Sequence, residues 1–146
     1  MATRHLDTLH PFDRFGEHSY ALLRLAAGNL FACHGAQKIF GVLGAHQVAE
    51  VGTRMWLAGM IELIGGSLIA LGLAASWAGL IASGEMFVAY FIAHAPKGGD
   101  PISNGGELAL LYAFVFLYVA AHGAGAWSLE GLLRGPRFHR TAEARR

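Results

Sequence analysis

Residues 55–75, MWLAGMIELIGGSLIALGLAA, form an almost unbroken apolar segment in which Glu62 is the one ionisable residue. A helix that rises about 1.5 Å per residue needs about 20 such residues to cross about 30 Å of hydrocarbon. The segment has this length, and it therefore predicts a transmembrane helix.

Three further segments have a similar length and character, at 19–40, 77–95 and 106–127. So little separates the second segment from the third that we expect a tight helical hairpin at residues 74–76. Between the third and fourth segments, Pro96, Pro101 and several glycines predict a loop. The polar stretch 41–54 is expected to leave the membrane, with a short surface helix as one form that it can take. The fold class that follows is an all-α, integral membrane four-helix bundle.

The composition of the 146-residue chain agrees with this prediction, since 54% of its residues are hydrophobic and only 14% are charged. Its 11 Lys and Arg nearly balance its 10 Asp and Glu, so no nucleic-acid partner is expected. The single cysteine excludes an internal disulfide and a dithiol relay. Cys33 is expected to be a small apolar core residue.

The distribution of Lys and Arg predicts the orientation, because loops on the cytoplasmic side of a membrane are enriched in both. With the N-terminus inside, three such residues face outward, Lys38, Arg54 and Lys97, and seven face the cytoplasm: Arg4, Arg14, Arg134, Arg137, Arg140, Arg145 and Arg146. Both termini are therefore predicted to be cytoplasmic. Residues 1–17 then form a cytoplasmic N-terminal segment, 18–130 the four-transmembrane-helix domain and 131–146 a basic cytoplasmic tail.

Eight ionisable residues fall inside the predicted spans, although each costs about 2.5 to 3.5 kcal/mol at a helix centre. By depth, Arg24 and His122 lie in the inner half, Glu85 lies near the middle, and His34, Lys38, Glu62, His94 and Glu107 lie toward the outer side. Such residues either pair with one another to hold a bundle together or form a functional site, and both interpretations stay open.

Helix periodicity decides which of these residues can meet. His34 and Lys38 are four residues apart, so they share a face. Glu85 and His94 are nine residues apart and lie on opposite faces of a straight helix, so they cannot serve one site unless that helix bends. Small residues at 59, 66 and 70 beside Glu62 on the second helix, and at 28 and 35 on the first, predict faces on which another helix can approach closely. The face of Glu62 is therefore expected to be interior.

Several short motifs follow one another in a characteristic order: HGAQK at 34–38, ELIGG at 62–66, LGL at 71–73, GELALLY at 106–112, GAG at 123–125 and WSLE at 127–130. In this order and spacing they resemble the DoxX family of small four-helix bacterial membrane proteins, over about residues 18–130. The resemblance implies a multi-pass protein of the bacterial cytoplasmic (inner) membrane. By this resemblance, Lys38, Glu62 and Glu107 correspond to polar positions of the family pattern. The family pattern does not generally include His34, Glu85, His94 and His122.

The resemblance also implies a function, because some DoxX members look like membrane subunits that pass electrons to quinone and others are associated with redox-defence enzymes. Quinone reduction takes up two protons with two electrons, so its site needs titratable groups in an apolar pocket. The expected catalytic residues are His34, Lys38, Glu62 and Glu107, and the expected cofactor-binding residues are Arg24, Glu85, His94 and His122. Quinone is the expected cofactor, and the lipid bilayer and a membrane protein partner or a second copy are the expected partners.

Two other classes of function stay open, and whether the chain is itself an enzyme is not decided. One is a haem or metal site, in which His34 and His94 act with Glu62 or Glu107 as ligands. The other is a non-catalytic assembly subunit, in which the buried ions only specify helix packing.

Overall fold

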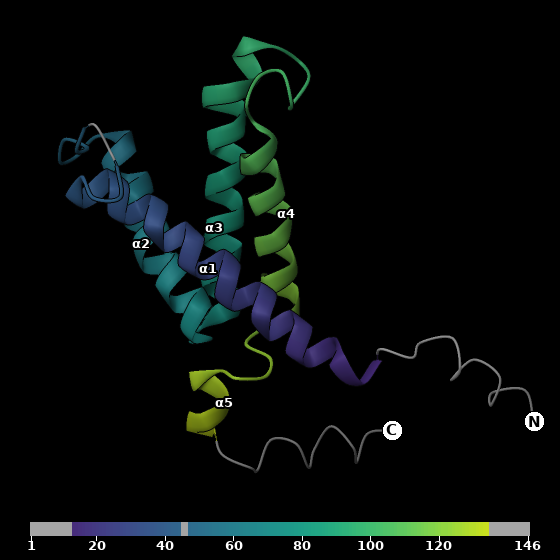
Figure 1. The fold of residues 1–146 in the computed structure, drawn as a ribbon. Helices are drawn as coiled ribbons and strands as arrows, with labels where there is room; N and C mark the ends of the chain where they lie inside the picture. The colour runs from purple at the N-terminus through teal and green to yellow at the C-terminus, as the bar shows by residue number, and fades with distance from the viewer. Residues whose placement is uncertain (1–12, 45–46, 135–146) are drawn as a thin grey trace, which may run out of the picture.

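The structure, a computed structural model, describes residues 13–44 and 47–134 and is all-α over these residues. Four long helices follow one another, and Figure 1 shows their arrangement: α1 (Gly16–Phe40), α2 (Arg54–Leu71), α3 (Ala75–Ala89) and α4 (Glu107–His122). Shorter elements are the 3-10 helices Asp13–Phe15 and Ala95–Lys97, the π-helix Tyr90–His94 and the helix α5 (Leu129–Arg134). The all-α prediction is confirmed. Most of the predicted N-terminal segment and tail, residues 1–12 and 135–146, lies outside the described residues.

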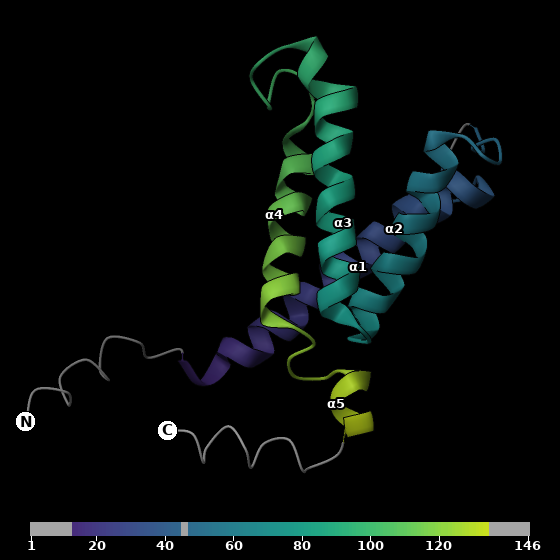
Figure 2. The same ribbon diagram turned by 180° about the vertical axis from the view of Figure 1, so that it is seen from behind.

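The long helices form two antiparallel pairs that diverge from each other. Helix α1 packs along α2, α3 packs along α4, and the pairs join mainly through α2 and α3. Figures 1 and 2 show a V whose arms meet near the turn at 72–74, beside α5; we call this the turn end. The arms separate toward residues 41–44, 47–53 and 98–106, which we call the loop end.

Glycines bring the backbones of α1 and α2 into direct contact. A Cβ added at Gly28 would lie 2.8 Å from the carbonyl oxygen of Gly66, and one at Gly66 would lie 2.5 Å from the amide nitrogen of Ala32. Gly35 lies equally close to the backbone of Gly59 and Leu63. The small-residue face predicted from the sequence is thus the α1–α2 interface, where only glycine permits this approach.

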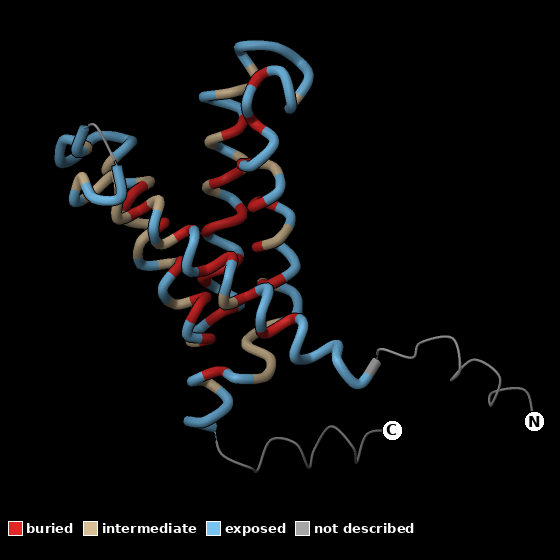
Figure 3. The backbone as a smooth tube through the Cα atoms, viewed as in Figure 1, coloured by how far each residue is buried: buried red, intermediate tan, exposed pale blue. Residues whose placement is uncertain are grey.

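Helices α3 and α4 meet through Gly79, which lies against the backbone of Phe116 and Ala120. The hydroxyl of the buried Ser83 donates a hydrogen bond of 2.8 Å to the carbonyl oxygen of Ala113, which fixes the register of the pair. The largest fully buried apolar side chains include Phe31, Ile69 and Phe116. As Figure 3 shows, buried positions are frequent where the two arms converge.

Two helical segments of the described chain are long and apolar enough to cross a membrane, Arg54–Leu71 and Ala75–Lys97, and α4 is apolar but has only 16 residues. Large apolar side chains face outward along the long helices. They include Leu22, Leu30, Ile64, Trp77, Phe91, Leu111 and Phe114. A soluble monomer rarely exposes so much contiguous apolar surface, so these faces suit contact with lipid. The number of spans and the orientation remain predictions.

Three details differ from the sequence-based predictions. Helix α4 ends at His122 rather than at residue 127, because Gly123 and Gly125 take positive φ values of 86° and 60° that stop a helix. The described residues of the 41–53 segment form turns and irregular chain rather than a surface helix. Cys33 is exposed, so the prediction that it is a core residue is wrong; it lies on the outward face of α1.

Candidate functional site

A cavity of about 1170 Å³ lies between the two helix pairs and extends toward the loop end. All four long helices line it, because the arms of the V diverge there and leave their inner faces unpacked against each other. Its walls are mostly apolar and include Phe31, Ile61, Leu80, Ile81 and Leu108. The fold therefore provides a pocket suited to a large apolar ligand.

Five of the predicted site residues line this one cavity: His34, Lys38, Glu62, Glu85 and His94. They come from α1, α2, α3 and the π-helix that follows α3. The sequence placed most of them in one half of the bundle by depth, and the structure places them around one cavity. Tyr112 from α4 also lines it and was not selected from the sequence, because a tyrosine in an apolar helix resembles an ordinary core residue.

Lys38 and Glu62 form an ion pair across the α1–α2 interface. The ammonium Nζ of Lys38 donates to Oε1 of Glu62 at 2.5 Å, and the Glu62 side chain is only 3% exposed. The other carboxylate oxygen of Glu62, Oε2, is buried and has no hydrogen-bond partner. An acceptor buried without a partner costs free energy, and Glu62 lies on the wall of the cavity.

Glu85 is a second carboxylate on the same cavity. Its Oε2 is also buried without a hydrogen-bond partner. The side chain lies within electrostatic range of both Glu62 and Lys38. One ammonium group therefore faces two carboxylates, and only one of them is paired with it in a salt bridge.

His94 reaches the cavity because the helix does not continue as a regular α-helix. Residues Tyr90–His94 form a π-helix, which places one extra residue in the turn. In a regular α-helix, nine steps of about 100° each place Glu85 and His94 about 180° apart around the helix axis. The extra residue of the π-helical turn removes about one such step of rotation, so the two side chains are about 80° apart. The condition set by the sequence, that the helix must deviate for both residues to share a site, is met by this π-turn.

The loop-end connection fixes the orientation of His94. Its Nδ1 lies 3.3 Å from the carbonyl oxygen of Asn104, which can only accept, so Nδ1 carries the proton and donates. Asn104 is buried and is itself held, because its amide donates to the carbonyl oxygen of Gly98 at 2.7 Å and its Oδ1 accepts from Gly106 N at 2.8 Å. Sequence analysis missed Asn104, whose surroundings of glycine and proline indicate only a loop.

Asp100 orders the same connection from the solvent side. A hydrogen bond from the Ser103 hydroxyl, with further bonds from the amides of Ile102 and Ser103, lowers the pKa of the Asp100 carboxyl. These contacts form an Asx-type turn. The turn and Asn104 together hold the segment that supports His94.

The three other predicted site residues lie away from the cavity. Glu107 is exposed in the first turn of α4 and is not among the residues that line the cavity wall. Arg24 and His122 lie at the turn end, which agrees with the inner depth that the sequence indicated for both. The structure therefore does not bring these three residues together with the five that line the cavity.

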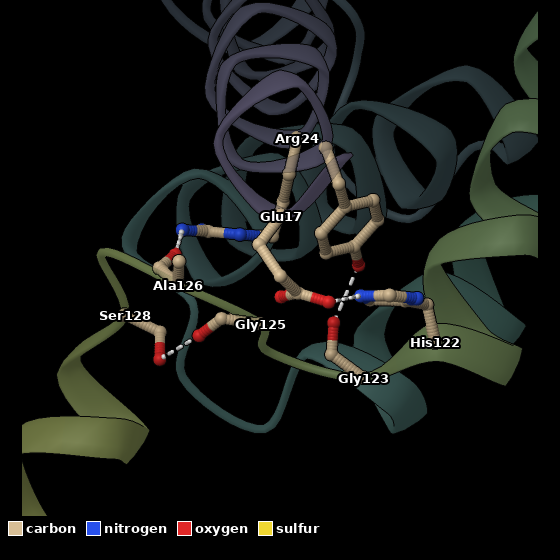
Figure 4. Close-up of polar contacts among 8 residues, drawn as sticks. Glu17, Arg24, His122, Gly123, Gly125, Ala126 and Ser128 are labelled. Atoms are coloured by element: carbon tan, nitrogen blue, oxygen red, sulfur yellow. Dashed lines mark hydrogen bonds and ion pairs between the residues drawn. The ribbon is translucent and has the colours of Figure 1, made fainter. Parts of the chain in front are cut away.

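Arg24 is completely buried and binds backbone carbonyls rather than a carboxylate. Its guanidinium Nη1 donates to the carbonyl oxygens of Ile69 and Ala70, at 2.5 and 2.6 Å. Nη2 donates to those of Ala126 and Trp127, at 3.3 and 2.9 Å. A cation suits the C-terminal end of α2, where carbonyl groups are unpaired and the helix dipole is negative. Figure 4 shows how Arg24 ties the segment after α4 to the bundle.

His122 belongs to a separate contact at the same end, also drawn in Figure 4. Its ring packs on that of Tyr20 with centroids 3.8 Å apart, and its Nε2 lies 3.6 Å from a carboxylate oxygen of Glu17. The Tyr20 hydroxyl donates to the carbonyl oxygen of Gly123 at 2.5 Å. These contacts join the start of α1 to the end of α4, and no pattern in the sequence indicates Glu17 as a partner.

Over residues 13–44 and 47–134, the structure contains no group of three or more His, Cys, Asp and Glu side chains arranged to hold a metal ion. His34 and His94 nevertheless line the same cavity.

Comparison with known proteins supports the sequence-based resemblance. The family model described as DoxX matches residues 19–95, which is more than half of the chain. The chain is similar to a protein of Haemophilus influenzae that carries the name "Uncharacterized protein", with 39% identity over 128 residues that cover 84% of this chain and 96% of the relative. No solved structure matches the chain.

Proposed function

This chain belongs to the DoxX family, and from that premise we propose that it is a membrane subunit whose loop-end cavity binds the head group of a quinone. The observation that carries the proposal is the cavity itself. It combines apolar walls, against which the prenyl tail and ring of a quinone can lie, with titratable side chains that include His34, Lys38, Glu62, Glu85 and His94. Sites for small molecules and cofactors commonly have this composition, with a few polar groups that fix the orientation of an apolar ligand.

The residues suit the chemistry of a quinone. Reduction of a quinone to a quinol takes two electrons and two protons. Lys38 is a hydrogen-bond donor for one quinone oxygen, and Glu85 and His94 are titratable groups for proton transfer. The electrons would be exchanged with a partner subunit that carries a flavin, haem or iron–sulfur centre. The protein would thus serve as the quinone-interacting subunit of a membrane oxidoreductase, with a protein partner or a second copy beside it.

The proposed location is the bacterial cytoplasmic membrane. With both termini in the cytoplasm, as the seven-to-three distribution of Lys and Arg predicts, the loop end faces outward. The cavity then lies in the extracytoplasmic half of the bilayer. A quinone dissolved in the membrane can enter between the arms of the V without crossing an aqueous phase.

Quinone binding by the full-length protein in lipid nanodiscs tests the proposal. Titration with decylubiquinone, followed by quenching of the intrinsic tryptophan and tyrosine fluorescence, should show saturable binding. Glu85→Gln should weaken or alter this binding while the protein remains folded, because Oε2 of Glu85 has no partner to lose. The matched control is Glu50→Gln, an exposed residue outside the cavity. Non-saturable partitioning that is identical in all three proteins would overturn the proposal.

A second candidate function is a non-catalytic assembly subunit. It is favoured by the Lys38–Glu62 pair, which lies in the α1–α2 interface and stabilises it whether or not a ligand binds. Under this alternative, Glu85→Gln leaves the activity of an assembled complex unchanged, and only variants of the pair alter assembly. The absorbance spectrum of the purified protein would reveal the haem alternative directly.

A further inference from the structure

Helix α5 has an apolar face that the described residues leave largely uncovered. Leu132 and Leu133 are each 78% exposed, and Leu129 is 40% exposed. At about 100° per residue, these three positions lie within about 100° of one another, on one face of the helix. Glu130 and Arg134 lie on another face, where they form an ion pair of 2.6 Å. The short helix is therefore amphipathic.

The fold holds this face in a fixed direction. The amide of Glu130 donates to the carbonyl oxygen of Gly72 at 3.0 Å, which joins α5 to the end of α2. The hydroxyl oxygen of Ser128 accepts from the Gly131 amide at 3.1 Å and so caps the first turn. Arg24 holds the segment just before α5, as Figure 4 shows. The exposed leucines thus belong to an anchored helix.

A helix of this length needs a contact on its apolar face. Helix α5 has six residues, and isolated helices shorter than about 12 residues are marginal in water. Most of the stability of such a helix comes from the packing of an amphipathic face. Within the part of the chain that the structure describes, little packs on the leucines of α5, so its apolar face suits a surface outside the bundle.

The neighbouring helix ends show the level at which α5 lies. Leu71, the last residue of α2, is 51% exposed, and Trp77 near the start of α3 is 72% exposed. Exposed apolar and Trp side chains at the end of a span suit the boundary between hydrocarbon and head groups. Because α5 is bonded to Gly72, it lies at this boundary. In the predicted orientation, this is the cytoplasmic side of the membrane.

The sequence that follows α5 carries the charge that fits this position. Beyond Arg134 it contains one acidic residue, Glu143, and four arginines, at 137, 140, 145 and 146. Basic segments next to a membrane span attract anionic lipids, whose negative surface potential belongs to the cytoplasmic leaflet. A surface of anionic phospholipids therefore complements both the apolar face of α5 and the charge beside it.

From these observations we propose that α5 is an interfacial helix that docks on anionic phospholipids of the cytoplasmic leaflet. Leu129, Leu132 and Leu133 enter the boundary of the acyl chains, and the arginines that follow contact the head groups. This surface lies at the turn end, away from the loop-end cavity. The inference does not rest on quinone binding.

Hydrogen–deuterium exchange of the full-length protein in lipid nanodiscs tests the proposal. The discs contain either phosphatidylcholine alone or phosphatidylcholine mixed with phosphatidylglycerol. In the anionic discs, segment 129–134 should exchange at least about tenfold more slowly than in the neutral discs, because attraction of several arginines to the lipid stabilises the docked helix. Added salt should reduce the difference, since it screens this attraction.

Two sets of substitutions separate the apolar contact from the charge. Leu132→Gln with Leu133→Gln should abolish the protection, because glutamine keeps the helix propensity but not the apolar face. The matched control is Val51→Gln, a residue that is also 78% exposed but lies at the loop end, and it should keep the protection of α5. Arg137→Gln with Arg140→Gln should reduce the difference between the two lipid compositions.

Each part of the proposal can fail separately. Equal exchange of segment 129–134 in neutral and anionic discs would overturn the assignment to anionic lipid. Protection that survives Leu132→Gln with Leu133→Gln would show that the leucines do not contact the bilayer, and a protein partner would then be the occupant to seek. The arginine variant leaves α5 itself unchanged, so an unaltered lipid preference in that variant would overturn the proposal whether or not the leucine variant folds.

Discussion

Replacement of Gly66 by alanine should separate α1 from α2. A Cβ at this position would lie 2.5 Å from the amide nitrogen of Ala32 and 2.6 Å from the carbonyl oxygen of Gly28. Ordinary van der Waals contact begins at 3.4 Å, so the two helices must move apart by about 0.9 Å. The atoms in the way are backbone, which cannot rotate aside. Overpacking of this kind costs about 1 to 3 kcal/mol.

The adjacent residue is a matched control. A Cβ at Gly65 has no heavy atom within 4 Å, and Gly65→Ala is in the same helix turn. Both substitutions gain up to about 1 kcal/mol of helix propensity. The difference between the two variants therefore isolates the interhelical contact, and Gly66→Ala should be less stable than Gly65→Ala by about 1 to 3 kcal/mol.

Thermal unfolding of both variants in a mild detergent, followed by circular dichroism, measures this difference. The separation of the helices should also weaken the Lys38–Glu62 pair, which bridges the same interface. Equal stability of the two variants would refute the claim that the backbones of α1 and α2 are in contact at Gly66.

Three further predictions concern charge. Lys38→Met and Glu62→Gln should each destabilise the protein, and the double-mutant cycle should show a coupling of about 1 kcal/mol or more, because either single change leaves an uncompensated charge; additive losses would show that the pair does not form in solution. Arg24→Met should cost about 2 kcal/mol or more and expose residues 123–134 to protease, because its bonds to the carbonyls of Ala126 and Trp127 are lost; Arg14→Met, an exposed position, is the control, and unchanged protection would contradict this role. Reporter fusions after residues 17 and 134 should be cytoplasmic, and fusions near 50 and 99 should be external; an external reporter at either terminus would contradict the predicted orientation.

The helices and their order were predictable because their signals are local. A run of apolar residues decides a helix by itself, and glycine with proline at 96–106 decides a loop. The contact faces of α1 and α2 were also predictable, since Gly28, Gly35, Gly59 and Gly66 repeat at helical spacing on one face of each helix, and the structure shows that these two faces meet each other. Depth along each helix then placed Lys38 and Glu62 at similar levels, and they are paired in the structure.

The rest of the site depends on features that no short pattern encodes. The angle between the two helix pairs results from the packing of many side chains, so the cavity is not visible in the sequence. The π-turn that brings His94 to the cavity adds one residue to a helix whose sequence, YFIAH, looks regular. The partners of Arg24 are backbone carbonyls, which carry no sequence signal. The sequence therefore could not distinguish this structural role from that of a site residue. Glu107 matched the family pattern, yet its side chain is exposed.

Photoaffinity labelling tests the central claim, that the loop-end cavity holds the quinone head group, most directly. The full-length protein in native membranes is irradiated with an azido-substituted quinone, and the modified peptides are located by mass spectrometry. The account predicts labelling within 54–62 and 80–94, the parts of α2, α3 and the π-helix that line the cavity, and its suppression by excess decylubiquinol. Labelling confined to outward-facing residues such as Leu111 and Phe114, or labelling that the competitor does not reduce, would contradict it.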